Sequence, residues 1–344
     1  MDWQRFGATS AIVTAVAEGR SWFVFRLNER SAAIVARLVD DALALQVEES
    51  VLPNGAHVVD AGLGVPGSLE AGRLFSEACL AGLGRVRIRQ LQLDDAVMPG
   101  VEVSVSQPPL ACLAAQYAGW AVDVPASGDS PRYRAMGSGP ARALHGHEPI
   151  FETVRYRETG KRAVLALETR QLPTANVAAW VAEKCGVPAD GVHLLVAPTA
   201  SIVGSVQVAA RIVETGLHKM VEVGFDVSTV QSGFGTCPLA PVAGDDLTAI
   251  GRTNDAVLFG GRVWYTVRTD DASIERVIEQ MPSSASSDYG VPFRTLFQRY
   301  GGDFYKIDPG LFSPAQISIT NGVSGKTFTA GTVNVTLLRE SFFA

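Results

Sequence analysis

The sequence predicts an α/β fold. Segments with strand-like alternation and segments with helical spacing follow one another along most of the chain, and clusters of glycine and proline separate them. The chain has 344 residues, 47% of them hydrophobic, which is enough to bury one large core or the cores of two ordinary domains. This composition excludes a disordered protein.

The first part of the chain is predicted to contain a helix, a hairpin and then mixed elements. The stretch MDWQRFGATSAIVTAVAEGR favours an amphipathic helix over a secretory signal, because Asp2 lies where such a signal is positively charged. Asn54-Gly55 separates two strand-like runs, Leu43–Val51 and Ala56–Val59, and predicts a hairpin. The spacing then predicts a helix, two strands, a helix and a strand, at Glu70–Leu80, Val86–Leu91, Val101–Val105, Pro109–Ala121 and Trp120–Val124.

The middle of the chain is rich in glycine. Residues 125–146, PASGDSPRYRAMGSGPARALHG, have the composition of a loop and suggest a boundary between two domains, 1–145 and 146–344. Either domain could be built from separated stretches of chain. The segment 137-GSGPAR-142 lacks the Lys-Ser/Thr of a P-loop, and 61-AGLGVPG-67 does not complete a dinucleotide-binding motif. Both are interpreted as tight turns.

The second part is predicted to begin with a strand, a helix and a strand, at Ala163–Glu168, Asn176–Cys185 and Val192–Ala197. A single helix is expected next, over residues 198–220, with Thr199 or Ser201 capping its start. Its apolar face should pack inward and contains Ile202, Val206, Ala209, Val213 and Leu217.

A polar stripe lies almost opposite that apolar face and contains Gln207, Arg211, Glu214 and His218. In one interpretation the stripe faces solvent, and Arg211–Glu214 is an i,i+3 pair worth about 0.2–0.5 kcal/mol. In the other, the stripe faces a cleft, where the guanidinium keeps the carboxylate ionised and the carboxylate takes a proton from a bound water. Periodicity alone favours the first interpretation and does not decide between them.

Charge, cysteine content and hydropathy limit the class of protein. The net charge of −6 argues against a nucleic-acid binder. No apolar run reaches the roughly 18–20 residues of a membrane span, so we expect a soluble, cytoplasmic protein. The four cysteines form no C-x-x-C pair and are expected to be buried free thiols.

Long phrases that occur in order along nearly the whole chain carry a family resemblance. They are 59-VDAGLGVPGSLEAG-72, 110-LACLAAQYAGW-120, 135-AMGSGPARAL-144, 197-APTASIVGSVQ-207, 211-RIVETGLHKM-220, 253-TNDA-256, 303-DFYKIDPGLFSPAQI-317 and 321-NGVSGKTFTAG-331. Together they resemble the methenyltetrahydromethanopterin cyclohydrolase family. About the first 25 residues lie outside the resemblance.

The resemblance implies both a fold and a reaction. The fold is two α/β domains with a large interdomain pocket, assembled as a homotrimer. The reaction is the reversible hydrolysis of 5,10-methenyl-tetrahydromethanopterin to the 5-formyl compound, a step of one-carbon metabolism. The pterin is the substrate carrier, and the family needs no metal and no redox cofactor.

The resemblance also implies site residues. It identifies Arg211 and Glu214 as the catalytic pair, with the glutamate as general base and the arginine tuning it and positioning water. Archaeal members often carry lysine at the position of Tyr117, so a role for an ammonium there does not extend to this chain. The resemblance further implies that Gln116, Tyr117 and Ala118 line the substrate site. Further candidates to line the pocket are Ser138, Gly139, Thr199, Ser201 and Asn254, for which a plain turn or cap is the alternative.

Two alternatives remain open at this point. One is an amidohydrolase in which Cys112 or Cys237 acts as nucleophile with a histidine. The other is a non-catalytic pterin-binding subunit of a formyl-transfer assembly, which the presence of the Arg-x-x-Glu pair disfavours.

Overall fold

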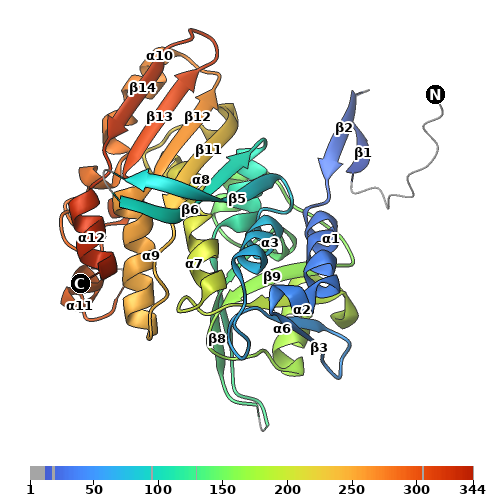
Figure 1. Cartoon of the computed structure of the whole chain (residues 1–344). Coiled ribbons are helices and arrows are strands. Elements are labelled where there is room, and N and C mark those ends of the chain that lie inside the picture. The colour runs from blue at the N-terminus through green and yellow to red at the C-terminus, as the bar shows by residue number, and fades with distance from the viewer. Residues whose placement is uncertain (1–11, 18–19, 94–95, 129, 304–305, 344) are drawn as a thin grey trace.

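The strands that the structure describes form two large sheets and one small two-stranded sheet. The computed structural model describes residues 12–17, 20–93, 96–128, 130–303 and 306–343. In this part of the chain there are two six-stranded sheets and one two-stranded sheet, with helices packed between and around them (Figure 1). The predicted α/β class is therefore confirmed.

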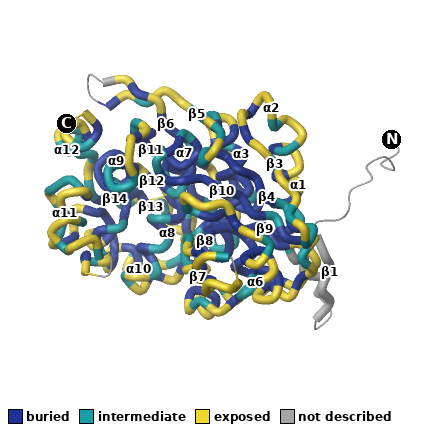
Figure 2. Tube along the Cα trace, turned by 90° about the horizontal axis from the view of Figure 1, so that it is seen from below, coloured by how far each residue is buried: buried dark blue, intermediate teal, exposed yellow. Residues whose placement is uncertain are grey.

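The first six-stranded sheet has a parallel centre and antiparallel edges. Its strands, in spatial order, are β3 (Glu48–Val51), β4 (His57–Asp60), β10 (Val192–Val196), β9 (Ala163–Glu168), β8 (Tyr133–Ser138) and β7 (Trp120–Val124). β4, β10 and β9 run parallel to one another, whereas β3, β8 and β7 pair antiparallel to their neighbours. β9 and β10 are buried along nearly their whole length, as parallel central strands usually are (Figure 2).

Helices cover both faces of the first sheet. One apolar cluster joins the sheet to α1 (Leu27–Asp40) and α3 (Leu69–Cys79). A second cluster on the opposite face joins it to α6 (Ala175–Cys185). Alternate residues of β9 enter the two clusters: Val164 lies in the first and Leu165 in the second. The segments that follow β9 and β10 therefore begin at the edge of the sheet where the carboxyl ends of these strands lie.

The second six-stranded sheet has one face covered and one face open. Its strands, in spatial order, are β14 (Thr327–Gly331), β13 (Gln316–Asn321), β12 (Arg262–Val267), β11 (Val230–Pro238), β6 (Ala96–Val105) and β5 (Gly84–Leu93). α8 (Ile212–Glu222) and α9 (Asp246–Gly260) pack on its inner face. Phe234 and Trp264 are about half exposed on the other face, because exposed and buried residues alternate along β12 and, on either side of Phe234, along β11.

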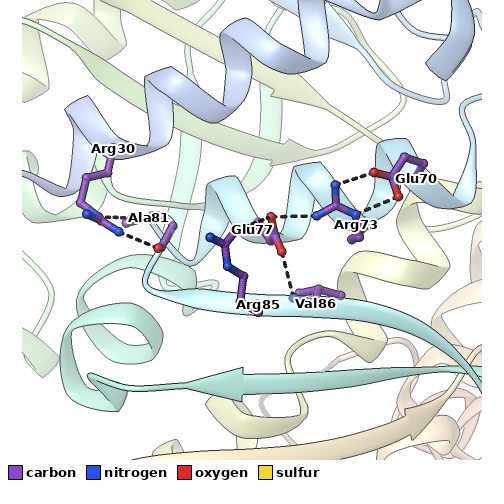
Figure 3. A network of polar contacts seen from close by, with 8 residues as sticks. Arg30, Glu70, Arg73, Glu77, Ala81, Arg85 and Val86 are labelled. Carbon is purple, nitrogen blue, oxygen red and sulfur yellow. Dashed lines mark hydrogen bonds and ion pairs between the residues drawn. The ribbon is translucent and has the colours of Figure 1, made fainter. Parts of the chain in front are cut away.

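A polar network ties the edge of the second sheet to the helices of the first (Figure 3). Glu77 on α3 is 1% exposed, accepts from the backbone N–H of Val86 on β5 (3.1 Å), and lies 2.9 Å from the guanidinium of Arg73. Arg30 on α1 donates to the carbonyls of Ala81 and Gly82 in the turn between α3 and β5. These contacts fix α1, α3 and β5 relative to one another.

α3 and α7 (Ile202–Ala209) pack closely because a glycine lies at their contact. A Cβ added at Gly72 would lie 2.6 Å from the Cβ of Val206, so a larger residue would force the helices apart. The remaining helices are α2 (Ala42–Leu45), η1 (Pro109–Gln116), α4 (Ala141–His145), α5 (Ile150–Val154), η2 (Ala189–Gly191), η3 (Val227–Thr229), α10 (Asp271–Glu275), η4 (Ile278–Gln280), η5 (Ser283–Ala285), α11 (Phe293–Arg299), η7 (Pro309–Leu311) and α12 (Val335–Phe343).

Three local predictions are wrong. Residues 12–17 and 20–25 form the antiparallel strands β1 (Ile12–Ala17) and β2 (Arg20–Phe25) instead of a helix, in keeping with their content of β-branched and aromatic residues. The part of that predicted helix in residues 1–11 lies outside the described residues. Leu43–Leu45 are helical, although the hairpin that follows is confirmed. Residues 125–146 contain β8 and α4 instead of the predicted loop. β8 occupies the position between β7 and β9 in the first sheet.

The two sheets do not follow the predicted halves of the sequence. Each sheet takes strands from both sides of residue 145, so a unit built around either sheet is discontinuous in sequence. The domain boundary and a large pocket between the domains stay predictions. Within the described part of the chain, no helix is long and apolar enough to cross a membrane.

Candidate active site

The helix predicted over residues 198–220 is interrupted at its centre. α7 ends at Ala209, the N–H of Arg211 bonds back to the carbonyl of Val208, and regular bonding resumes when Thr215 donates to the carbonyl of Arg211. The side-chain amide of Gln116 donates to the carbonyl of Ala210 at 3.1 Å. A carbonyl at the break thus accepts a hydrogen bond from the side chain of a distant segment. Local spacing in the sequence could not predict this contact.

The polar stripe along α7 and α8 is buried, so its interpretation as a solvent face is wrong. Gln207 and Glu214 are only 4% and 5% exposed, and Arg211 and His218 are half-buried. η1 and β12 pack against this part of the chain. Burying charged and amide groups costs free energy unless they are paired. The hydrogen-bond partners of these groups therefore indicate the function of the site.

Arg211 is oriented by a chain of hydrogen bonds that ends on a second carboxylate. Its Nε and Nη2 donate to Oε1 of Gln207 at 3.1 and 2.9 Å. The amide nitrogen of Gln207 donates in turn to Glu168 at 3.1 Å, and the hydroxyl of Thr199 donates to the other oxygen of Glu168. The acceptor Glu168 therefore fixes which way the Gln207 amide points, and the amide oxygen then holds the guanidinium.

Glu214 lies beside this chain without joining it. Among the described residues, no hydrogen bond or ion pair to its carboxylate is found, so the i,i+3 ion pair considered for a solvent-exposed stripe does not form, and the catalytic roles of Arg211 and Glu214 stay predictions. Burial raises the pKa of Glu214 to about 7, and the positive charges of Arg211 and Arg142 offset that rise only in part. Desolvation outweighs the guanidinium, which corrects the expectation that Arg211 keeps the carboxylate fully ionised.

A carboxyl group with a pKa near 7 suits proton transfer in both directions. At neutral pH it exists in both protonation states, so it can accept a proton in one step and return it in the next. Two neighbouring tyrosines do not compete for this role. The pKa of Tyr117 is raised to about 12 by burial and by the charge of Glu214, and that of Tyr265 is raised further by burial.

The predicted residues at the end of η1 lie against the helix break. Gln116 reaches Ala210, and its own carbonyl accepts from the hydroxyl of Ser138 at 2.7 Å. Gly139, at φ +107°, donates its N–H to the carbonyl of Ala115. The Tyr117 ring stacks on that of His218 at 4.6 Å, and the half-buried Ala118 follows it. Gln116, Tyr117, Ser138 and Gly139 are thus brought together with Arg211 and Glu214.

Two other predicted residues make hydrogen bonds within their own helices, and their contact with a substrate stays a prediction. Ser201 caps α7 by accepting from the N–H of Gly204, and its hydroxyl donates to the carbonyl of Pro198. Asn254 uses its amide on the carbonyl of Ile250, one turn earlier in α9. Among the hydrogen bonds of the described residues, none joins either of them to the other candidate residues.

Two residues of the site were missed by sequence reasoning. Glu168 ends a buried parallel strand, a position that often carries functional side chains in α/β folds, and this signal was available. The sequence pattern around Arg142 predicts only a turn, whereas its side chain is 0% exposed. A charged residue within the apolar run after Pro140 was the available signal for it.

The thiols do not support a cysteine nucleophile. All four cysteines are free and buried, as predicted. Burial raises the pKa of both Cys112 and Cys237 far above the ordinary thiol value, which holds them in the unreactive protonated form.

Comparisons with known proteins identify the class and then the family. The family described as Cyclohydrolase (MCH) matches residues 26–342, which places the chain among the cyclohydrolases. Three relatives are each named methenyltetrahydromethanopterin cyclohydrolase. That of Methanococcoides burtonii is 41% identical over 319 residues, with 92% of this chain and 98% of the relative covered. Those of Methanococcus maripaludis and Methylobacterium organophilum are 45% and 43% identical, with 92% of this chain and 97% of each relative covered. The chain belongs to the methenyltetrahydromethanopterin cyclohydrolase family.

Proposed function

We propose that this chain catalyses the reversible hydrolysis of 5,10-methenyl-tetrahydromethanopterin to 5-formyl-tetrahydromethanopterin. The observation that carries the proposal is the buried carboxyl of Glu214, with a pKa of about 7, beside an arginine held by Gln207. Family membership supplies the substrate class.

The substrate is electrophilic before it meets the protein. Its methenyl carbon lies between two nitrogens and shares their positive charge, so the protein has to supply a positioned, partly deprotonated water. We infer that Glu214 removes one proton as the water oxygen attacks that carbon, which gives a neutral carbinol. Glu214 then protonates the leaving nitrogen, the carbon–nitrogen bond breaks, and the carbinol hydroxyl releases its proton to solvent. One cation and one water thus give one formyl compound and one proton.

Arg211 is proposed to hold the attacking water and to moderate Glu214. Its guanidinium is anchored on one side by Gln207 and remains half-buried. Its charge opposes the effect of burial on Glu214, which keeps the pKa of the carboxyl near 7 instead of higher.

The residues at the end of η1 are proposed to contact the pterin. The Oε1 atom of Gln116 is buried and has no hydrogen-bond partner among the described residues. A buried acceptor of this kind is costly unless a ligand donor reaches it, and a pterin carries such donors. Tyr117, Ala118, Ser138, Gly139 and Thr199 are proposed neighbours of the same ligand. No metal or redox cofactor is needed for the steps above, and the homotrimer and the cytoplasmic location stay predictions.

The test is an absorbance assay of the methenyl chromophore with the purified protein. We expect methenyl-tetrahydromethanopterin to be hydrolysed at a rate proportional to protein concentration, and methenyl-tetrahydrofolate, run in parallel, to be hydrolysed far more slowly. Ligand protection against heat without any turnover would contradict the proposal and would favour the non-catalytic pterin-binding subunit. Turnover that disappears on thiol alkylation of the folded protein would favour the cysteine mechanism.

A further inference from the structure

Arg142 is a fully buried arginine that the reaction described above does not use. Its Nε donates to both carboxylate oxygens of Glu148 at 2.9 and 3.2 Å, and its Nη1 donates to the carbonyls of Leu113 and Ala115 at 2.9 and 3.1 Å. A buried charge is tolerated only when such partners surround it, so the position of this guanidinium is firmly fixed.

The carbonyls that Arg142 holds lie at the end of η1. This helix is wound with i to i+5 bonds, and the last of them runs from the N–H of Tyr117 to the carbonyl of Cys112. The carbonyls of the last turn of a helix lack partners within the helix. Arg142 supplies partners to two of them, and so determines where the chain leaves the helix at Gln116 and Tyr117. Short π-helical segments of this kind are frequent at functional sites.

The same turn contacts α8 and the break before it in two ways. Gln116 donates to the carbonyl of Ala210, directly before Arg211. The Tyr117 ring stacks on His218, which lies one turn after Glu214, and the Arg142 guanidinium lies 5.1 Å from the centre of the Tyr117 ring. A displacement of Arg142 would therefore be transmitted to both catalytic residues.

Arg142 also contributes charge at the carboxyl of Glu214. The titratable groups that interact with this carboxyl come from four surrounding elements or their ends: Arg211, Arg142, Cys112, Tyr117 and Tyr265. Burial raises the pKa of Glu214, and Arg142 is one of the two cations that lower it. The cysteine and the tyrosines remain protonated near neutral pH, so within the described part of the chain the two arginines are the groups that oppose the desolvation of Glu214 with a full charge.

We propose that Arg142, held by Glu148, is a positioning residue for this site: it fixes the Gln116–Tyr117 turn against the α7–α8 break and places a second positive charge near Glu214. The inference rests on the proposed function for the reaction that is affected, but the geometry and the charge effect do not depend on the substrate.

Two substitutions separate the two parts of the proposal. Arg142→Lys keeps the charge and loses the planar fork that reaches Glu148 and the two carbonyls together, whereas Arg142→Gln loses both. Arg30→Gln is the matched control, because Arg30 also donates to two turn carbonyls but belongs to the network at the edge of the second sheet. Each variant is checked for folding by circular dichroism and thermal unfolding.

The first measurement is the titration of Glu214 itself. The protein is labelled with glutamate carrying ¹³C at the side-chain carboxyl, and the Glu214 resonance is assigned by its absence in Glu214→Gln. We expect Arg142→Gln to raise the titration midpoint by roughly 0.5–1 pH unit, because one nearby positive charge is removed. Arg142→Lys and Arg30→Gln should leave the midpoint at its wild-type value. A wild-type midpoint in folded Arg142→Gln would overturn the charge effect.

The second measurement is turnover in the methenyl assay. We expect Arg142→Lys to lower kcat by about tenfold with an unmoved pH profile, because the charge stays while the turn shifts. A kcat within twofold of wild type would overturn the positioning role, and this variant decides the matter if Arg142→Gln does not fold. Absence of turnover in the wild-type protein would contradict the proposed function instead, and the titration would still test the effect of Arg142 on Glu214.

Discussion

Two arginine–glutamate pairs on neighbouring helices of this protein differ in the partners that their glutamates have. Arg73 and Glu77 lie on α3, in the network of Figure 3, and Arg211 and Glu214 lie at the break between α7 and α8. Both glutamates are nearly inaccessible, at 1% and 5% exposure. One oxygen of Glu77 accepts from the N–H of Val86, and the other lies 2.9 Å from Arg73. Glu214 has no comparable partner among the described residues.

The difference separates a structural pair from a reactive one. At Glu77, contacts to a strand and to an arginine hold the carboxylate in place and join two parts of the fold. At Glu214, the guanidinium of Arg211 donates to Gln207 instead of to the carboxyl, and burial raises the pKa of that carboxyl to about 7. Spacing in the sequence is similar in the two cases, so the neighbours from other segments make the distinction.

The largest expected effect comes from removing the reactive carboxylate. Glu214→Gln keeps the size of the side chain and loses the base, so kcat should fall by about 10²–10⁴-fold while the affinity for substrate changes little. The measurement is steady-state kinetics of the methenyl assay, with binding followed separately by calorimetry. A variant with near-normal kcat would show that Glu214 is not the base.

The matching substitution at the structural pair should have the opposite outcome. Glu77→Gln removes a buried charge from beside Arg73 and should destabilise the fold by about 1–3 kcal/mol. The value of kcat below the unfolding temperature should stay close to wild type, because α3 holds this carboxylate at the edge of the second sheet. Thermal unfolding together with kinetics checks both statements. A large loss of kcat without loss of stability would erase the distinction between the two pairs.

A smaller effect is expected from releasing Arg211. Gln207→Leu removes the amide that anchors the guanidinium and leaves Glu168 without one of its two donors. The value of kcat/KM should fall by roughly tenfold, the usual size for one lost hydrogen bond to a charged group. Gln280→Leu, at an exposed amide that bonds only within its own turn, is the control. Equal kinetics in the two variants would contradict the orienting role of Gln207.

Periodicity predicted much of the fold, because burial in a sheet or along a helix leaves a local pattern. The helix at α3 and the strands β5, β9 and β10 were all found in this way. β8 was missed because its glycine and polar residues resemble a loop, and its place is fixed only by pairing with β7 and β9. The N-terminal hairpin was missed because small and β-branched residues also fit an amphipathic helix.

The candidate site was only partly predictable for a related reason. The spacing of Gln207, Arg211 and Glu214 placed them on one side of the chain, and the family resemblance selected the pair. The helix break depends on Gln116, which is 94 residues away, and the orientation of Arg211 depends on Glu168, at the end of a different strand. The ionisation of Glu214 depends on the depth of burial, which no local pattern reports.

The pH dependence of hydrolysis tests the central claim most directly. Because burial raises the pKa of Glu214, the basic form is lost as the pH falls, so kcat should decline on the acid side with a midpoint near 7. Arg211→Ala removes a positive charge that favours the carboxylate, and should move this midpoint upward by roughly one pH unit. A midpoint near 4.5, the ordinary value for a glutamate, or a midpoint that Arg211→Ala leaves in place, would contradict the account.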